Sequence, residues 1–214
     1  MEKISTKEKI LKTALDLFNN EGVELVSLRQ IARALEISDG NLRYYFKSKE
    51  DLVVQLYENM LEEMEANLVL KQQPNVDLAG VLRQIRIGLD IQYKYKFILI
   101  NLVEICRKIA LIRKHYREAT RRRNEAFHLI TEQLIARGYL REDSSLPHRQ
   151  NIFTIYHILG NFWAIEADLQ GETDHACIIN YFFRVNSSLI EPYLTEKGKI
   201  AFEQYFTGFA ASAP

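Results

Sequence analysis

The sequence predicts an all-α protein, and three features of its composition and patterning support that fold class. Only four prolines and nine glycines interrupt a 214-residue chain rich in Leu, Ile, Glu, Lys, Arg and Ala. Apolar residues recur at helical spacing, while the alternation expected of a strand is almost absent. Helix-start signatures recur as well, such as Ser5 with Glu8. Because 47% of the residues are apolar, the chain can close a sizeable core.

The first fifty residues predict three helices, over 5–20, 28–35 and 38–46. Ser5 and Glu8 form a capping box for the first helix, and Gly22 can end it. Ser27 with Gln30 caps the second helix in the same way, and Ser38 is the expected N-cap of the third. Glu36 and Ile37 leave room only for a tight turn between these two. Two short helices joined in this way form a helix-turn-helix.

The remaining sequence predicts seven further helices from the same signals. Their expected ranges are 48–70, 77–95, 97–111, 112–138, 147–171, 174–194 and 196–208. Ser48 with Asp51, Asp77, Ser145 with Pro147, and Asp174 are the start signals. Gly138 and Gly171 are stop signals. We therefore expect an N-terminal three-helix domain over 1–50 and a C-terminal helical domain over 51–214.

Composition and motifs exclude several classes of protein. Lys plus Arg equals Asp plus Glu at 28 each, so net charge does not indicate a nucleic-acid partner. No apolar run is long enough for a membrane span, and we expect a cytoplasmic protein without a membrane partner. Cys106 and Cys177 are expected to be buried thiols rather than a disulfide. No pattern typical of a metal site, a P-loop or a catalytic nucleophile occurs, so we predict no catalytic residue, no metal and no cofactor.

The exposed side of the predicted helix 38–46 has the residue types of a DNA recognition helix. Helical spacing turns Leu42 and Phe46 inward and places Gly40 and Tyr44 on the opposite side. Asn41, Arg43, Ser38 and Asp39 flank that side, where polar side chains can contact base edges and phosphates. The alternative is a plain αα-corner in which Tyr44 and Tyr45 pack into the core.

Three segments follow one another here in fixed order: "LFNNEG", "SLRQIARAL" and "ISDGNLRYYFKSKEDL". Over residues 6–52 they resemble the TetR family of bacterial transcriptional regulators. The most characteristic positions of that family hold Gly40, Leu42, Tyr44, Phe46, Lys49 and Leu52. The resemblance implies a homodimer that binds a palindromic operator in double-stranded DNA and usually represses transcription until a small-molecule effector binds its C-terminal domain. Beyond residue 52 the resemblance is architectural.

The resemblance implies specific DNA contacts. Ser27, Tyr44, Tyr45 and Lys49 would contact phosphates, and Asp39, Gly40, Asn41 and Arg43 would face bases or nearby backbone. The full predicted set is Ser27, Arg29, Gln30, Ser38, Asp39, Gly40, Asn41, Arg43, Tyr44, Tyr45, Lys47 and Lys49.

Two positions depart from the family pattern. Arg43 stands where the family commonly has Tyr, and Tyr45 stands where it often has His. Arg43 can pair with both O6 and N7 of guanine, which predicts a G·C pair in each half-site. The alternatives are a phosphate contact or a pair with Asp39 one turn away. For Asp39 we favour stabilisation of the helix N-terminus over acceptance from cytosine N4.

Polar groups recur among apolar residues in the C-terminal helices, as an effector pocket requires. The predicted pocket residues are Tyr93, Phe97, Asn101, Glu104, Phe127, His128, Phe153, Tyr156, His157 and Trp163. For each of them the alternative is an ordinary core residue with satisfied hydrogen bonds.

Helices 147–170 and 174–194 combine large and small residues, which suits a two-fold four-helix bundle. The predicted dimer contacts are Phe153, Gly160, Ala164, Ala167, Tyr181, Phe182, Val185, Ser188 and Leu189. The alternative is an ordinary core pair of helices. The basic run over 113–123 indicates a solvated helix face, an anionic effector site or an auxiliary DNA contact.

The sequence thus predicts a dimeric DNA-binding transcriptional regulator, a repressor released from its operator by an unidentified small molecule. One alternative is a regulator without a small-molecule effector, for which a filled C-terminal core would be expected. The other is a helical ligand-binding protein or enzyme whose N-terminal helices are only structural.

Overall fold

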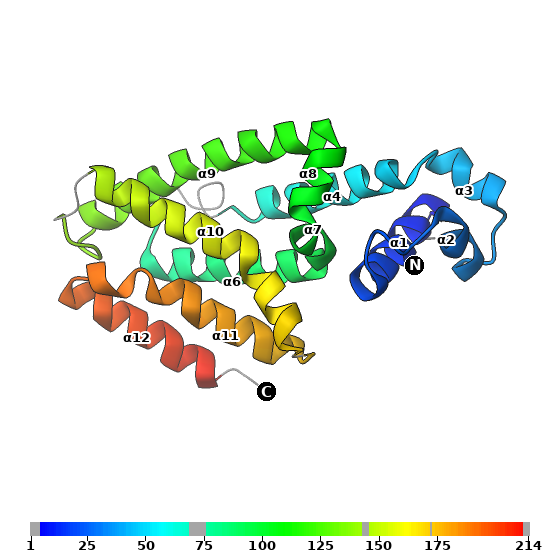
Figure 1. Cartoon of the computed structure of the whole chain (residues 1–214). Coiled ribbons are helices and arrows are strands. Elements are labelled where there is room, and N and C mark those ends of the chain that lie inside the picture. The colour runs from blue at the N-terminus through cyan, green and yellow to red at the C-terminus, as the bar shows by residue number, and fades with distance from the viewer. Residues whose placement is uncertain (1–4, 69–75, 143–145, 172, 212–214) are drawn as a thin grey trace. The chain divides into compact units, whose positions relative to one another are not determined.

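The computed structural model describes residues 5–68, 76–142, 146–171 and 173–211. In these ranges every regular element is a helix, with one isolated antiparallel bridge between Leu140 and Leu194 (Figure 1). The helices are α1 (Thr6–Glu21), α2 (Leu28–Ala34), α3 (Asp39–Tyr45), α4 (Lys49–Ala66), α6 (Leu78–Lys94), α7 (Lys96–Ile100), α8 (Leu102–Lys108), α9 (Ala110–Ala136), α10 (Leu146–Gln170), α11 (His175–Ser188), the 3-10 helix η1 (Glu191–Tyr193) and α12 (Glu196–Ala211). The all-α prediction is confirmed.

The chain divides into two compact units. The N-terminal unit consists of 1–63 and 92–116, and the C-terminal unit of 64–91 and 117–214. The division falls inside α4, α6 and α9, so these three helices contribute residues to both units. The predicted boundary at residue 50 therefore differs from the compact units, because the helices beyond α3 also supply core residues to the N-terminal unit.

Side-chain caps and one shared core hold the short N-terminal helices together. Ser5 with Glu8 and Ser27 with Gln30 form the two predicted capping boxes. The Ser38 hydroxyl accepts from the backbone N–H of Asn41 at 3.1 Å. The buried core residues of these helices are Ile10, Leu11, Ala14, Leu15, Phe18, Leu28, Ile31, Ala32, Leu42 and Phe46. The predicted helix-turn-helix is thus present, with its apolar residues inside.

The turn between α2 and α3 forces a non-glycine residue into a left-handed conformation. Glu36 has φ 55°, a region that favours glycine. The backbone N–H of Ile37 donates to Ala32 O at 3.0 Å, and that of Glu36 to Arg33 O at 3.1 Å. This pair of bonds closes α2 in a Schellman motif. The chain can then reverse within the two residues that the sequence left for the turn.

Asn19 joins α1 to the segment 92–116 within the N-terminal unit. Its amide Nδ2 donates to the carbonyl of Lys94 at 2.9 Å, and its Oδ1 accepts from the N–H of Phe97 at 3.1 Å. Next to it, the rings of Phe18 and Phe97 pack with their centroids 5.2 Å apart. Lys108 also pairs with Glu24 at 2.9 Å. Helix α1 therefore packs against α7, and an ion pair connects the loop after α1 to α8.

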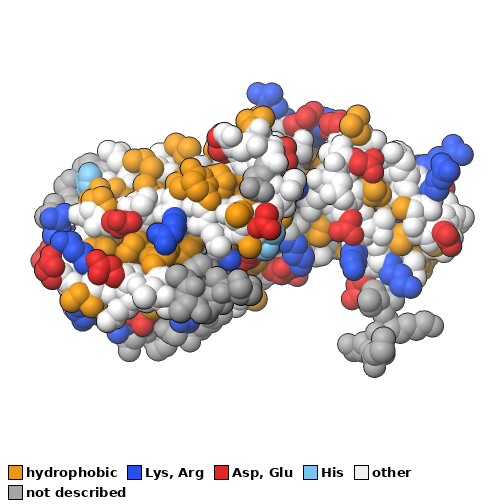
Figure 2. Space-filling model, turned by 90° about the horizontal axis from the view of Figure 1, so that it is seen from below, with side chains coloured by type: hydrophobic (Ala, Val, Ile, Leu, Met, Phe, Trp, Pro, Cys, Tyr) orange, Lys and Arg blue, Asp and Glu red, His pale blue; other side chains and the backbone are white. Residues whose placement is uncertain are grey.

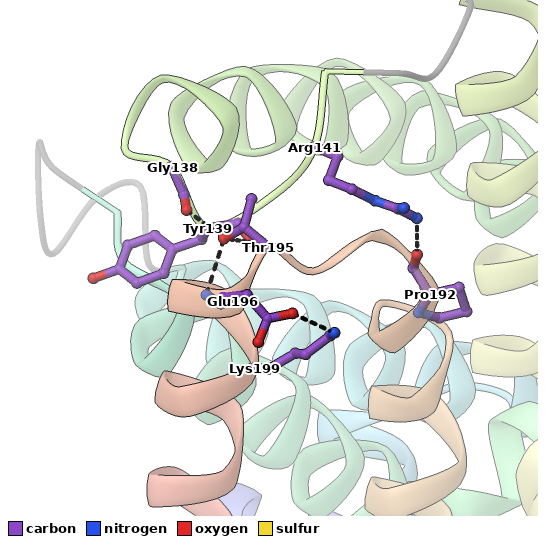
Figure 3. A network of polar contacts seen from close by, with 8 residues as sticks. Gly138, Tyr139, Arg141, Pro192, Thr195, Glu196 and Lys199 are labelled. Carbon is purple, nitrogen blue, oxygen red and sulfur yellow. Dashed lines mark hydrogen bonds and ion pairs between the residues drawn. The ribbon is translucent and has the colours of Figure 1, made fainter.

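In the C-terminal unit, polar contacts join the end of α9 to the start of α12 (Figure 3). The Thr195 hydroxyl donates to Gly138 O at 2.6 Å, and the Thr195 N–H donates to Tyr139 O at 3.0 Å. Arg141 donates to the carbonyl of Pro192. Gly138 has φ 72° and ends α9 as predicted. These contacts fix where α12 begins.

Three expectations from the sequence are wrong. The helix predicted over 97–111 breaks into α7 and α8 at Asn101, whose side-chain amide donates to Phe97 O at 2.8 Å and so competes with helix continuation. The helix predicted over 174–194 ends at Ser188, because Pro192 cannot continue it. Cys177 is exposed and Cys106 half-buried, so the two thiols are not both buried. The expected start at Ser145 lies outside the described residues.

Gly198 leaves no room for a side chain, which gives a stability prediction. A Cβ at this position would lie 2.2 Å from the backbone oxygen of Tyr139. We expect Gly198→Ala to lower the free energy of unfolding by about 1–3 kcal/mol, measured by urea denaturation. Gly208→Ala on the same helix is the control, since a Cβ there meets nothing within 4 Å. Equal effects of the two substitutions would contradict the close approach of α12 to Tyr139.

Candidate nucleic-acid interface

The two-turn helix α3 exposes the side that the sequence predicted. Leu42 is fully buried and Phe46 is 4% exposed, so both turn into the N-terminal core. Tyr44 is 82% exposed and Tyr45 38%, with their rings edge to face at 5.1 Å. The alternative in which these tyrosines form core is therefore excluded. Gly40, Asn41 and Arg43 are also exposed.

Arg43 makes two contacts within its own chain. Its Nε lies 2.7 Å from Asp39 Oδ2, and its Nη1 donates to the carbonyl of Lys47 at 3.2 Å. Both members of the ion pair keep about half of their side-chain surface exposed. This is the pair with Asp39 that the sequence offered as an alternative. It leaves Arg43 accessible and holds the guanidinium along the surface of α3.

Three residues of the predicted DNA-contact set also stabilise the fold. Ser27 and Gln30 bond to each other in the capping box of α2, with Ser27 N–H to Gln30 Oε1 at 2.8 Å. The Lys49 ammonium donates to Val23 O at 2.6 Å and Glu24 O at 3.3 Å. Lys49 thereby joins the start of α4 to the loop before α2. Arg29 and Lys47 remain exposed, and neither is needed by the core.

Gly40 has open space around it in the free protein. A Cβ at this position would meet only the Ser38 hydroxyl, at 4.0 Å. The backbone of α3 is helical there and does not require glycine. The absence of a side chain is thus not explained by packing within the described structure. A glycine here would let a partner approach the backbone of α3 closely.

Four of the ten predicted pocket residues belong to the N-terminal unit and have structural contacts there. Phe97 is buried against Phe18, and Asn101 ends α7. Glu104 is exposed and pairs with Lys108 at 3.1 Å. Tyr93 is half-buried, with the Lys96 ammonium 5.7 Å from its ring centroid.

The other six predicted pocket residues lie in the C-terminal unit, and three of them form an aromatic cluster: Phe127, Phe153 and His157. Phe127 and Phe153 lie 5.6 Å apart, and Phe153 stacks on His157 at 5.6 Å. Burial raises the pKa of the Tyr156 phenol although the residue is only half-buried, so its hydroxyl end points inward. Burial, with a smaller effect of Arg123, lowers the pKa of His157, which is therefore neutral at neutral pH. His128 packs against Phe127, and Trp163 is buried against Phe182.

Comparisons with known proteins agree with this geometry. Residues 10–56 match the model of the bacterial regulatory proteins of the tetR family, and residues 59–202 match the TetR model described as a bacterial transcriptional repressor. The second match alone covers more than half of the chain. The chain belongs to the TetR family.

Individual relatives extend the comparison. The transcriptional regulator RutR of Escherichia coli is 36% identical over 93 residues, which are 43% of this chain and 44% of RutR. QacR of Staphylococcus aureus is 23% identical over 61% of this chain and 71% of QacR. The chain spans less than half of the length of the first curated relatives that it matches.

Solved structures support the same fold. A TetR-family regulator from Marinobacter aquaeolei has a TM-score of 0.83 and 24% identity, covering 94% of this chain and 99% of the other. A candidate transcriptional regulator from Saccharomonospora viridis, solved in complex with choline, has a TM-score of 0.65 and 18% identity, covering 89% and 97%. The two family models that match the chain describe bacterial transcriptional regulators.

The nine predicted dimer contacts differ in how deeply they are buried within this TetR-family chain. Phe153, Ala164, Ala167 and Phe182 lie in the chain's own core. Tyr181 and Ser188 are exposed, while Gly160, Val185 and Leu189 are half-buried. On the face seen in Figure 2, hydrophobic side chains gather over the C-terminal unit.

The sequence analysis missed two features of the C-terminal unit. The first is an apolar stripe on α10, formed by Ile155, Ile158, Phe162 and Leu169, which are each 46% to 77% exposed. The second is Arg123, a half-buried residue of the basic run whose neighbours Arg121 and Arg122 are exposed.

No helix in the described ranges is long and apolar enough to cross a membrane, and no cluster of potential metal ligands was found there.

Gly40 gives a prediction that separates binding from stability. We expect Gly40→Ala to leave the free energy of unfolding unchanged or raise it by up to about 1 kcal/mol, since Ala favours the helix. Affinity for operator DNA should fall at least about tenfold, because the methyl group occupies the contact surface. Urea denaturation and fluorescence anisotropy measure the two effects. Gly88→Ala, also in open space on a helix, should leave DNA affinity unchanged; a loss of stability in Gly40→Ala would contradict this role.

Proposed function

We propose that this regulator is a cytoplasmic homodimeric repressor that binds a palindromic operator and leaves it when a small molecule binds the C-terminal unit. The observation that carries the DNA-binding part is the surface of α3. Only Leu42 of its seven residues is buried. Gly40, Asn41, Arg43, Tyr44 and Tyr45 are all exposed and available to a partner.

The apolar stripe on α10 supports a homodimer. Its members Ile155, Ile158, Phe162 and Leu169 are spaced by three, four and seven residues, as along the seam of packed helices. Tyr181 of α11 is 62% exposed as well. A contiguous apolar stripe of this kind is typical of a protein interface. Among the residues predicted as dimer contacts, the exposed Tyr181 and Ser188 and the half-buried Gly160, Val185 and Leu189 remain candidates to join it.

The helices shared by the two units supply a route for a response to an effector. Each of α4, α6 and α9 has one part in either unit, so a movement of its C-terminal-unit part would also move its N-terminal-unit part. Asn19 then connects the end of α6 and the start of α7 to α1 through two backbone contacts. Because half-sites repeat about every 34 Å on one face of DNA, a small change in the separation of two α3 helices disfavours simultaneous binding.

A regulator controlled without a small molecule is the second candidate. The burial of Trp163 and Phe153 within the C-terminal core favours it, since these side chains fill space that a ligand would need. The half-buried polar groups of Tyr156, His157 and Arg123 favour an effector instead. We prefer the effector because the Arg123 guanidinium has only a weak acceptor, the sulfur of Met64, within the described part of the chain.

Selection of bound sequences from random duplex DNA, at about physiological salt, tests the proposed function. We expect a palindrome with at least one G·C pair per half-site. Arg43→Ala should lose about 1–3 kcal/mol of discrimination at that pair. The exposed Lys47 supplies the control, since Lys47→Ala should weaken all sequences about equally. A uniform effect of Arg43→Ala would contradict base contact, and recovery of no palindrome would contradict the dimeric operator complex.

A charge within the α10 stripe tests the dimer. Ile158 is 54% exposed in one chain, so Ile158→Asp should fold normally. Burial of an unpaired carboxylate costs several kcal/mol, and the dimer dissociation constant should rise at least about a hundredfold, measured by sedimentation velocity. Operator affinity should fall with it. Ile200→Asp on α12 is the matched control, with 56% exposure outside the stripe. A stable Ile158→Asp dimer would place the interface elsewhere.

A further inference from the structure

Arg123 occupies the inward side of α9. Ala119, Arg123, Phe127 and Leu134 are spaced by four, four and seven residues and so share one face of the helix. Ala119 is 8% exposed and Leu134 is 1% exposed. Arg117, Arg121 and Arg122 of the basic run are exposed, whereas Arg123 is half-buried. One guanidinium of the run thus points into the C-terminal unit.

This guanidinium has no carboxylate partner among the residues that the structure describes. Its Nη2 donates to the sulfur of Met64 at 3.7 Å, and a thioether is a weak acceptor. In contrast, Arg121 on the same helix pairs with Glu125 at 2.6 Å. A guanidinium carries five N–H donors, and a half-buried one that lacks an anion is costly. The site is therefore short of one negative charge.

Tyr156 and His157, which the charge of Arg123 reaches, are both neutral at neutral pH. Burial raises the pKa of Tyr156, and the charge of Arg123 partly opposes that rise. For His157, burial and the charge of Arg123 both lower the pKa, and burial has the larger effect. His157 remains neutral because both burial and Arg123 lower its pKa, so it adds no second positive charge. Tyr156 keeps its proton because burial raises its pKa, and its hydroxyl can donate. Phe153 and Phe127 extend this surface with apolar rings.

The residue after Arg123 carries a buried polar atom without a hydrogen-bond partner in the described structure. The side-chain oxygen of Asn124 is buried and has no hydrogen-bond partner in the structure. Such an atom costs free energy unless a ligand or water supplies a donor. Arg123 and Asn124 are consecutive on α9. A carboxylate accepts hydrogen bonds and cannot donate to this oxygen, so it is Arg123 that indicates an anion.

We propose that Arg123, with Tyr156 and the aromatic cluster formed by Phe127, Phe153 and His157, binds a monocarboxylate with an aromatic or otherwise apolar body. The proposal deepens the proposed function, since it names the chemical class of the effector. The planar guanidinium matches a carboxylate through two parallel hydrogen bonds. The aromatic rings suit the body of the ligand. A single cation balances one negative charge, which favours a carboxylate over a phosphate dianion.

Pairs of probes that differ only in charge test this inference on the wild-type protein. Benzoate and octanoate, each at about 10 mM, should raise the melting temperature by several degrees. Benzamide and octanamide should not, because they lack the charge. Choline, the ligand of one structural neighbour, should not bind either, since Arg123 repels a cation. Equal shifts from acids and amides, or no shift from any acid, would overturn the proposal.

Variants of the basic run locate the site. Arg123→Gln should weaken carboxylate binding by roughly tenfold to a hundredfold in isothermal titration calorimetry, as expected for loss of a charged hydrogen bond. Arg123→Lys keeps the positive charge but loses the two parallel N–H donors of the guanidinium. Its affinity for the carboxylate should therefore lie between those of the wild type and Arg123→Gln. Arg121→Gln is the matched control, with the same chemistry two residues away, and should bind like the wild type. Unchanged binding in Arg123→Gln would overturn the assignment.

Release from DNA is measured separately. If benzoate or octanoate binds through Arg123 but leaves operator affinity unchanged, the carboxylate site stands and the proposed release mechanism fails. If the protein binds an operator yet no carboxylate, the regulator stands and the site fails.

Discussion

The recognition surface depends on two helices that cannot be stable by themselves. α2 and α3 have seven residues each, well below the length at which a helix holds its own shape in water. Side chains at their ends supply what the backbone lacks: Ser27 with Gln30 for α2, and Ser38 for α3. Leu42 and Phe46 then attach α3 to the core of α1 and α2. Because so few residues of α3 maintain the fold, the side chains of the others are available to contact a partner.

The N-terminal unit was predictable because its apolar faces are narrow. In α1, the buried residues Ile10, Ala14 and Phe18 recur every four positions, and the caps are sequence-local. Asn19 was missed, since a polar residue near the end of a helix gives no sign of the backbone groups that it will contact. Segment 92–116 lies far away in sequence, and nothing local to Asn19 indicates Lys94 O or Phe97 N–H as its partners.

The C-terminal unit was less predictable for the opposite reason. Helix α10 is apolar on nearly every side, so spacing alone cannot tell the core from an interface. The sequence therefore placed the buried Ala164 and Ala167 in the dimer seam and overlooked the exposed Ile158 and Phe162. The inward position of Arg123 was overlooked for another reason. The apolar residues on the inward face of α9 are interrupted at position 123, and the side chains of a basic run are ordinarily exposed to solvent. A charged residue at the one missing position of an apolar row was the available signal.

The contact between Arg43 and Asp39 is compatible with base contact by Arg43. An exposed ion pair one helical turn apart contributes only about 0.3–0.5 kcal/mol. Both side chains remain about half exposed, so the pair is cheap to break. A bidentate contact between arginine and guanine provides about 1–3 kcal/mol of discrimination. The proposed contact with guanine would therefore outweigh the ion pair with Asp39. The carboxylate near the N-terminus of α3 also offsets the helix dipole, which gives Asp39 a use in both states.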